Sequence, residues 1–137
     1  MPILNVKLSG TPSASTTQRV ADLLLSATHD ILGKQPEVTA IALDYIAPEQ
    51  WLIAGKSLAE HRLASFYFDV KITEGTNTKD EKARYIAAVF KGMQAVLGEL
   101  HPESYIYVQE VRADAYGYAG LTQEYRYIAK QLDTNGA

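Results

Sequence analysis

Residues that commonly carry out catalysis or bind metals are sparse in this sequence. The chain has no cysteine, so disulfides and thiolate metal sites are excluded. Its three histidines, His29, His61 and His101, lie far apart, which gives a histidine-based metal site little support. No pattern indicates a catalytic triad or a pair of catalytic carboxylates. We therefore expect neither a metal ion nor another cofactor, and any chemistry must come from less usual groups.

Composition and charge narrow the classes of function. Sixteen acidic and thirteen basic residues give a net charge of −3, and no basic run is present, so nucleic acid is an unexpected partner. No apolar run reaches the roughly 18 residues that span a membrane, and the N-terminus has no pattern of a secretory signal. A length of 137 residues predicts a single domain over residues 1–137. We expect it to be cytoplasmic.

The hydropathy pattern occurs twice along the chain. Segments 3–8 and 66–72 alternate as strands do and share a Val-Lys-(Leu/Ile) triplet. Each is followed by a capping-box pattern, at 15–18 and 78–81, and by an apolar stripe with helical spacing. Further strands are predicted at about 38–46 and 104–111, each followed by a glycine-containing turn, at 51–55 and 116–120. The pseudo-repeats cover about 2–64 and 65–127, and a tail follows from 128 to 137.

This element order predicts an α+β fold made of two β-α-β units. A strand that returns through a helix lies parallel to the first, so we expect a four-stranded mixed sheet with two helices on one face. The two apolar stripes that should face the sheet are Val20, Leu23, Leu24, Ala27 and Ile31, and then Ile86, Val89, Phe90, Met93 and Leu97. Many residues expected on the other face are apolar or aromatic, which predicts a homo-oligomer.

Several segments resemble one known group of proteins. The chain starts Met1-Pro2-Ile3, and segments 33–36 (Gly-Lys-Gln-Pro) and 48–55 (Pro-Glu-Gln-Trp-Leu-Ile-Ala-Gly) are similar to the macrophage migration inhibitory factor. Tyr116-Gly117-Tyr118 is similar to the aromatic-Gly-aromatic segment of longer members. Residues 2–126 thus resemble the tautomerase superfamily, which includes 4-oxalocrotonate tautomerase, malonate semialdehyde decarboxylase and cis-3-chloroacrylic acid dehalogenase. The resemblance implies a homotrimer that acts on a small molecule.

The resemblance assigns the chemistry to Pro2. In this superfamily the reacting group is the secondary amine of an N-terminal proline, exposed when the initiator methionine is removed. A reference α-amino group titrates at about 7.7–8.0, and apolar surroundings disfavour its charged form. Such an amine can take a proton from a carbon next to a carbonyl and return it elsewhere. The alternative is that Pro2 merely begins an edge strand.

The resemblance also places side chains around the substrate. Lys34 matches a lysine that contacts substrate carboxylate in the inhibitory factor, although a solvated lysine past a helix end is an equal alternative. Tyr116 and Tyr118 match the aromatic wall of that protein's pocket. Trp51 falls at the active-site phenylalanine of 4-oxalocrotonate tautomerase, and Tyr107 falls near the family's active-site tyrosine. Aromatic residues in strands are also common in cores and interfaces.

The family's carboxylate-binding arginines are replaced here. The positions that they occupy in relatives hold Thr11, Ala40, Thr73 and Thr76. A threonine cannot imitate the bidentate guanidinium fork, so we expect weaker action on dicarboxylates than on monocarboxylates. Arg112 is the other cation that we consider for substrate binding.

Two further functions stay open beside a keto–enol isomerase. His29 falls at a catalytic histidine of the dehalogenase, but it lies opposite the apolar stripe of its helix, as surface histidines do. The dehalogenase glutamate falls near Ala115, with Asp114 beside it. A lyase or dehalogenase therefore has less support than an isomerase. A trimer that binds a protein or small ligand without catalysis is the third hypothesis.

Overall fold

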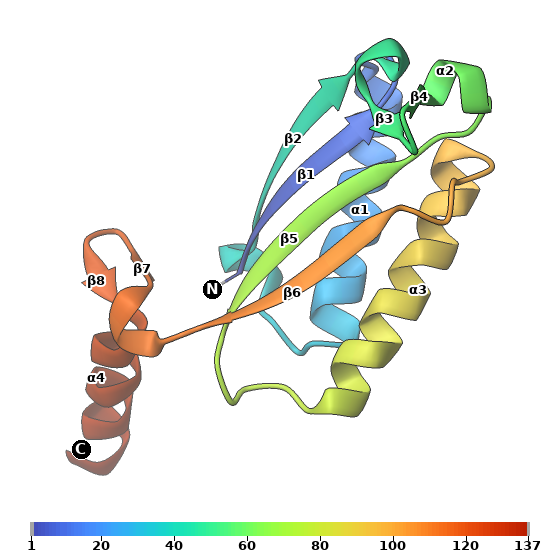
Figure 1. The fold of residues 1–137 in the computed structure, drawn as a ribbon. Helices are drawn as coiled ribbons and strands as arrows, with labels where there is room; N and C mark the ends of the chain where they lie inside the picture. The colour runs from blue at the N-terminus through green and yellow to red at the C-terminus, as the bar shows by residue number, and fades with distance from the viewer. Residues whose placement is uncertain (1, 137) are drawn as a thin grey trace.

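The computed structural model describes residues 2–136, and its centre is one four-stranded sheet (Figure 1). The first half consists of β1 (Ile3–Ser9), α1 (Ala14–Asp30) and β2 (Ala40–Ile46). The second half repeats this order with β5 (Phe66–Thr73), α3 (Lys79–Leu97) and β6 (Tyr105–Val111). The strand order is β2-β1-β5-β6. Pairing is parallel within each half and antiparallel between β1 and β5, which confirms the predicted α+β fold with a mixed sheet.

A short hairpin follows the second strand of each half. After β2 come the 3-10 turn η2 (Pro48–Gln50), β3 (Leu52–Ile53), β4 (Lys56–Ser57) and the short helix α2 (Leu58–His61). After β6 come η3 (Ala113–Ala115), β7 (Gly117–Tyr118), β8 (Leu121–Thr122) and α4 (Gln123–Gly136). Both hairpins turn through an Ala-Gly pair with positive φ at both residues, the geometry of tight two-residue hairpin turns. Because β1 and β5 are antiparallel, these two hairpins lie at opposite ends of the sheet.

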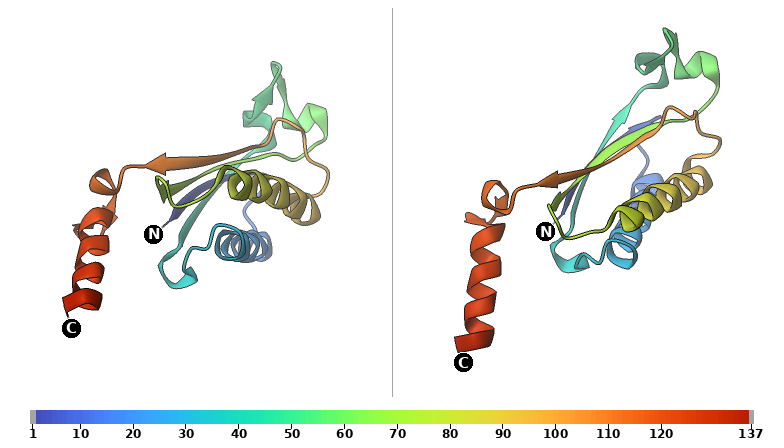
Figure 2. Two further views of the ribbon diagram at one scale, coloured as in Figure 1. Left: turned by 90° about the horizontal axis from the view of Figure 1, so that it is seen from below. Right: turned by 60° about the horizontal axis from the view of Figure 1, so that its bottom comes forward.

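The hydrophobic core lies between the sheet and the two long helices, which cover the same face (Figure 2). Alternate residues of β1 and β5 point into it, as the period-two pattern predicts. Its largest strand and helix members are Leu4, Leu8, Phe66, Phe68, Ile72, Leu24, Tyr85 and Met93.

The two helix starts differ in how well the sequence predicted them. At α3 the capping box is confirmed: Glu81 N–H donates to Thr78 Oγ1 at 3.1 Å, and Thr78 N–H donates to a Glu81 carboxylate oxygen at 2.7 Å. At α1 the predicted box at 15–18 is wrong. The helix begins earlier, because Ser13 caps it and accepts from the Thr16 N–H at 3.2 Å. The predicted stripe of α3 is also wrong at Ile86, which is 40% exposed.

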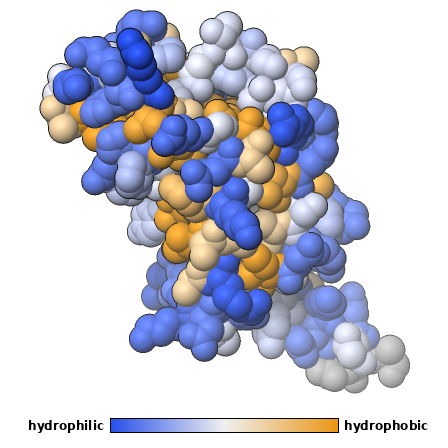
Figure 3. Space-filling model, turned by 90° about the vertical axis from the view of Figure 1, so that its right-hand side faces the viewer, coloured by the Kyte–Doolittle hydropathy of each residue, from blue (hydrophilic) through white to orange (hydrophobic). Residues whose placement is uncertain are grey.

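The sheet face away from the helices is more polar than we predicted. Asn5 and Lys7 lie on it in β1, and Asp69 and Lys71 lie on it in β5, where their side chains pair at 2.6 Å. Exposed aromatic side chains on this face are concentrated on β6, at Tyr105 and Tyr107. A different side of the molecule, the one that carries α2 and α3, has its apolar side chains gathered in a band bordered by hydrophilic ones (Figure 3).

The C-terminal segment forms an arm at one end of the sheet. Figure 2 shows α4 standing apart from the layer of α1 and α3. The predicted tail from residue 128 onward forms the last turns of α4, up to Gly136. The face of α4 that points away from the body exposes Tyr125, Ile128 and Leu132. No helix within residues 2–136 is long and apolar enough to cross a membrane.

Candidate functional site

Pro2 lies buried at the edge of a cavity of about 390 Å³ at the end of the sheet. Its carbonyl accepts from the Ala40 N–H at 3.1 Å, which extends the β1–β2 ladder by one residue and holds the proline in place. The cavity is lined mainly by apolar and aromatic groups, and Glu37 is its one acidic residue. The full lining is Pro2, Ile3, Glu37, Val38, Thr39, Ala40, Tyr116, Gly117 and Tyr118.

The β7–β8 hairpin supplies the aromatic wall of this cavity. Burial raises the pKa of the Tyr116 hydroxyl, and a hydrogen bond with the Ile3 backbone partly opposes that shift. Tyr116 therefore joins the hairpin to the residue next to Pro2. Gly117 allows the hairpin to close, because a Cβ at this position would lie 2.2 Å from the Leu121 carbonyl oxygen. The Arg126 guanidinium stacks on the Tyr118 ring at 3.8 Å and donates to the Tyr118 carbonyl at 2.9 Å.

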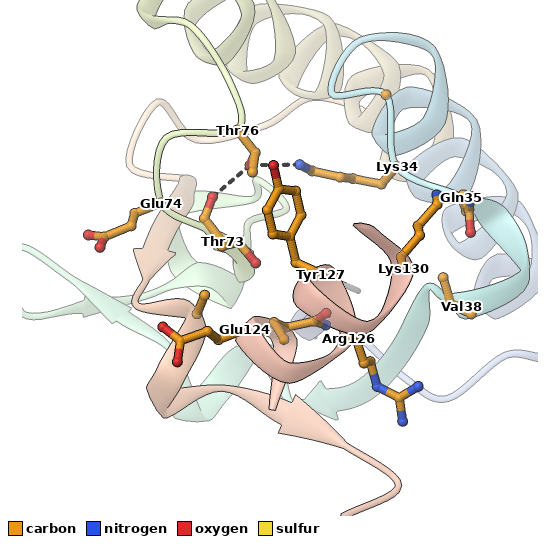
Figure 4. A pocket seen from close by; sticks show the side chains of 13 residues that line it. Lys34, Gln35, Val38, Thr73, Glu74, Thr76, Glu124, Arg126, Tyr127 and Lys130 are labelled. Atoms are coloured by element: carbon orange, nitrogen blue, oxygen red, sulfur yellow. Dashed lines mark hydrogen bonds between the residues drawn. The ribbon is translucent and has the colours of Figure 1, made fainter. Parts of the chain in front are cut away.

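A second cavity, of about 590 Å³, adjoins the first, since Val38 lines both. Figure 4 shows it between α4, the segment after α1 and the segment after β5. Lys34 Nζ donates to Thr76 Oγ1 at 2.9 Å, and Thr76 Oγ1 donates to the Thr73 carbonyl at 2.6 Å. Burial lowers the pKa of Lys34, with partial opposition from the Glu81 carboxylate. The ammonium thus lies beside the segment after β5 that carries Thr73 and Thr76.

The Lys34 loop is held by backbone contacts to α1 and a side-chain contact from the second half. Gly33 adopts φ +72°, a left-handed conformation that favours glycine, and its N–H donates to the His29 carbonyl at 3.0 Å. Lys34 N–H donates to the Thr28 carbonyl at 3.2 Å. Asn77 Nδ2 donates to the Leu32 carbonyl at 2.9 Å. These contacts fix the direction in which the lysine leaves the helix.

The predicted site residues are only partly brought together. Pro2, Tyr116 and Tyr118 line one cavity, and Lys34 lines the adjoining one. His29 is exposed, and its Nδ1 lies 3.0 Å from the Lys34 carbonyl oxygen, outside both linings.

Three other predicted residues lie elsewhere in the chain. Trp51 follows β2 and lies at the opposite end of the sheet from Pro2. Tyr107 is 54% exposed on the open face of β6, two strands from β1. Arg112 is held by Asp114 in a bidentate pair at 3.0 and 2.8 Å, and this carboxylate is the main reason that the pKa of Arg112 is raised.

Sequence reasoning missed the contribution of α4. Arg126, Tyr127 and Lys130 line the larger cavity, and Glu37 lines the smaller one. Gln123 lines the larger cavity too. The four positions on α4, 123, 126, 127 and 130, are spaced as residues on one face of a helix are, and this spacing was the signal in the sequence that could have revealed them. The described residues contain no group of three or more histidine, cysteine or carboxylate side chains that could hold a metal ion.

Comparison with known sequences identifies one relative by sequence. No protein-family model matches the chain. A probable tautomerase of Dickeya dadantii is 31% identical over 65 residues, which are 45% of this chain and 94% of that protein. Nearly all of the relative therefore corresponds to about half of this chain.

Solved structures with the same fold are similar along most of the chain. A fused 4-OT that forms a symmetric trimer has a TM-score of 0.75 at 19% identity, covering 89% of this chain and 96% of its own. A macrophage migration inhibitory factor-like protein of Entamoeba histolytica has a TM-score of 0.72 at 17% identity, covering 88% and 97%. A malonate semialdehyde decarboxylase has a TM-score of 0.72 at 16% identity, covering 93% and 96%. With the sequence relative, the repeated β-α-β fold and the matching motifs, this chain belongs to the tautomerase superfamily.

Proposed function

We propose that this protein is a cofactor-free keto–enol tautomerase that uses the Pro2 amine as its acid and base. The observation that supports this best is the burial of Pro2 on a largely apolar cavity walled by Tyr116 and Tyr118. A secondary amine in such surroundings favours its neutral form, which is the form that accepts a proton. The substrate is a small enol or α-keto acid that fits the 390 Å³ cavity.

In the proposed reaction Pro2 moves one proton between two substrate atoms. The neutral amine removes the proton from the enol hydroxyl or from the carbon beside the carbonyl, and the resulting ammonium returns it to the other position. This requires a processed N-terminus, because a proline nitrogen bonded to Met1 is an amide without a basic lone pair. Met1 lies outside the described residues, so its removal stays a prediction. Lys34 stabilises the negative charge of the substrate from the adjoining cavity.

A homotrimer is part of the same proposal. The fused 4-OT relative is a trimer, and two surfaces of this chain suit association. One is the exposed face of α4 with Tyr125, Ile128 and Leu132, and the other is the open sheet face with Tyr105 and Tyr107. Light scattering at micromolar concentration should give three times the mass of one chain, and a stable monomer would contradict this proposal.

The structure offers less support for hydrolytic dehalogenation. The acid nearest to the dehalogenase glutamate position is Asp114, and both of its oxygens accept from Arg112. That bidentate contact lowers the pKa of Asp114 and makes it a weaker base.

The proposal is tested by turnover of phenylenolpyruvate and 2-hydroxymuconate. Pro2→Ala should lower kcat/KM by at least about a hundredfold, the usual range for loss of a general acid–base. Pro102→Ala is the matched control, because Pro102 is exposed and lines neither cavity. Intact mass must show that the active species starts at Pro2. Full activity of a species that retains Met1 would rule out the Pro2 mechanism.

A further inference from the structure

Helix α4 presents its apolar side to solvent instead of to its own chain. The side that faces the body is mostly polar and lines the 590 Å³ cavity. The opposite side carries four apolar or aromatic residues, which we call the outer stripe: Tyr125, Ile128, Ala129 and Leu132. An amphipathic helix that packs only on its own domain places its apolar stripe against the core. The reversed arrangement of α4 predicts that something outside the chain covers the outer stripe.

Contacts with its own chain hold α4 only at its first turns. Within residues 2–136, its hydrogen bonds to earlier residues reach Tyr116, Tyr118 and Thr122, in or beside the β7–β8 hairpin. The helix packs mainly against η3 and β8, its neighbours in sequence. A helix of 14 residues is marginal in water without tertiary packing. Because α4 forms one wall of the larger cavity, the site needs a further contact that holds this wall.

The outer stripe has a shape and a charge that narrow the choice of partner. It lines a groove of about 400 Å³, and its three large side chains are each more than half exposed. Glu124 stands four positions before Ile128, and Asp133 four positions after Ala129, so a carboxylate borders the stripe on each side. This border disfavours an anionic lipid surface. It favours a partner that combines large apolar side chains with a cation.

The open face of the sheet, opposite α1 and α3, has this combination. Tyr105 and Tyr107 are more than half exposed there on the edge strand β6. Lys7 is exposed on the same face, in the row that runs through Tyr67 to Tyr105. Lys7 forms no ion pair with another of residues 2–136, so its ammonium is available to a carboxylate that borders the outer stripe. A tyrosine ring of this face fits the groove beside that carboxylate.

The two surfaces cannot meet within one chain. Figure 2 shows α4 extending to the same side of the sheet as α1 and α3, whereas the open face lies on the other side. The outer stripe of one copy can therefore reach only the open face of another copy. Such a contact joins two different surfaces, and its repetition around a threefold axis closes a ring.

We propose that the outer stripe of one copy docks on the open sheet face of the next copy, around Tyr105 and Lys7, and that this contact holds α4 in place as a wall of its own site. This inference rests on the homotrimer of the proposed function. It adds that each site takes its shape from the neighbouring copy, so turnover depends on assembly.

The first test measures assembly of the full-length chain by sedimentation equilibrium. Ile128→Glu on the outer stripe and Tyr105→Glu on the sheet face should each raise the dissociation constant at least about a hundredfold, because each buries an unpaired carboxylate in the contact. Lys7→Glu should raise it about fivefold, as expected for one exposed ion pair. Ile86→Glu is the matched control and should change it by less than about twofold. Ile86 is 40% exposed on α3, outside both surfaces.

The second test mixes two defective chains. The Ile128→Glu chain keeps a normal sheet face, and the Tyr105→Glu chain keeps a normal outer stripe, so a mixture forms one normal contact that neither chain forms alone. Turnover of phenylenolpyruvate should reappear in the mixture, at the chains whose outer stripe is intact. Adding Pro2→Ala to the Tyr105→Glu chain should therefore abolish the recovered turnover, whereas adding it to the Ile128→Glu chain should not. Circular dichroism confirms that each variant is folded.

Assembly is measured without turnover, so the outcomes separate this inference from the proposed mechanism. A trimer that withstands both glutamate substitutions, or an active protein whose mixed variants recover no turnover, would overturn the contact and leave the Pro2 mechanism intact. An inactive wild type that still dissociates through both substitutions would support the contact and refute the tautomerase. A monomeric wild type that binds phosphatidylserine vesicles through Ile128 would assign the outer stripe to a lipid surface and overturn the inference.

Discussion

Tyr85→Phe should change how the stability of this protein depends on alkaline pH. Tyr85 and Thr28 are both fully buried, and their hydroxyl oxygens are 2.9 Å apart, joining α3 to α1. Below pH 10 the substitution leaves the Thr28 hydroxyl without its partner, which costs about 1–2 kcal/mol. The contact also supports the site, because the Thr28 carbonyl accepts from the Lys34 N–H at 3.2 Å.

The pH effect follows from the ionisation of the buried phenol. Burial raises the pKa of Tyr85 from 10.0 to about 12 in the folded chain. Between these values the unfolded chain loses a proton that the folded chain keeps, so the free energy of unfolding falls as pH rises. At about 1.4 kcal/mol per pH unit, the wild type loses about 2–3 kcal/mol by pH 12. This stabilisation is fully present below about pH 10.

Because phenylalanine cannot ionise, the two stability curves should cross. The wild type should be more stable than Tyr85→Phe at pH 8 and equal to it or less stable near pH 12. Urea unfolding followed by far-UV circular dichroism, at one protein concentration throughout, measures both curves. Tyr125→Phe is the control, because Tyr125 is 58% exposed and its curve should stay parallel to the wild type. Parallel curves for the wild type and Tyr85→Phe would refute the burial argument.

Three further predictions each test a single feature of the fold or site. Glu37→Gln removes the acid of the Pro2 cavity. The protonated Pro2 amine then loses an exposed ionic partner and its pKa falls, so the acidic limb of the profile of kcat/KM against pH should move to lower pH by about 0.2–0.7 units. Gly117→Ala should lower both the melting temperature and turnover, because its Cβ would lie 2.2 Å from the Leu121 carbonyl oxygen; unchanged values in thermal unfolding and kinetics would contradict this. Ser13→Ala should cost about 1 kcal/mol in urea unfolding and Ser15→Ala much less, because Ser13 is the cap of α1.

Periodicity predicted the sheet and helices because burial dictates their residue patterns. The alternation in β1 and β5 and the shared triplet were sufficient to find the repeat. The inward face of α3 was harder, because Tyr85 is a polar aromatic and Ile86 is an aliphatic residue. Tyr85 can be buried there because its hydroxyl pairs with that of Thr28 on α1. A contact between residues 57 positions apart is invisible to a pattern within one helix.

The predicted site residues lie together where their placement depends on local segments and lie apart where it depends on strand direction. Pro2, Tyr116 and Tyr118 meet because the β7–β8 hairpin folds back on the start of β1. Trp51 occupies the matching place in the first half, but the antiparallel pairing of β1 and β5 puts its hairpin at the other end. The role of α4 was missed because its cations belong to the site only through the way that this helix meets the Lys34 loop.

The two ends of the sheet are built alike up to the helix that follows each hairpin. Leu58 N–H donates to the Trp51 carbonyl at 2.9 Å, and Gln123 N–H donates to the Tyr116 carbonyl at 2.8 Å. The ends then diverge. The helix after the first hairpin has four residues and that after the second has 14. Only β1 is preceded by a proline, whereas a serine precedes β5.

This similarity gives a matched pair of substitutions. In the first half, His61 Nε2 lies 2.9 Å from the Ile53 carbonyl oxygen. In the second half, Arg126 donates to the Tyr118 carbonyl at 2.9 Å. Each side chain therefore links its hairpin to the helix that follows it. Arg126→Ala removes a charge-assisted hydrogen bond and the stack on Tyr118, which together contribute about 1.5–3 kcal/mol. Part of this energy holds Tyr118 at the cavity, so kcat/KM should fall by about tenfold. His61→Ala should lower the stability and leave kcat/KM within about twofold, since its end of the sheet has neither Pro2 nor the cations Lys34 and Arg126. Steady-state kinetics and urea unfolding of both variants decide this. Equal losses of kcat/KM would show that the first hairpin also forms part of the site, and would overturn the view that the α4 end alone carries it.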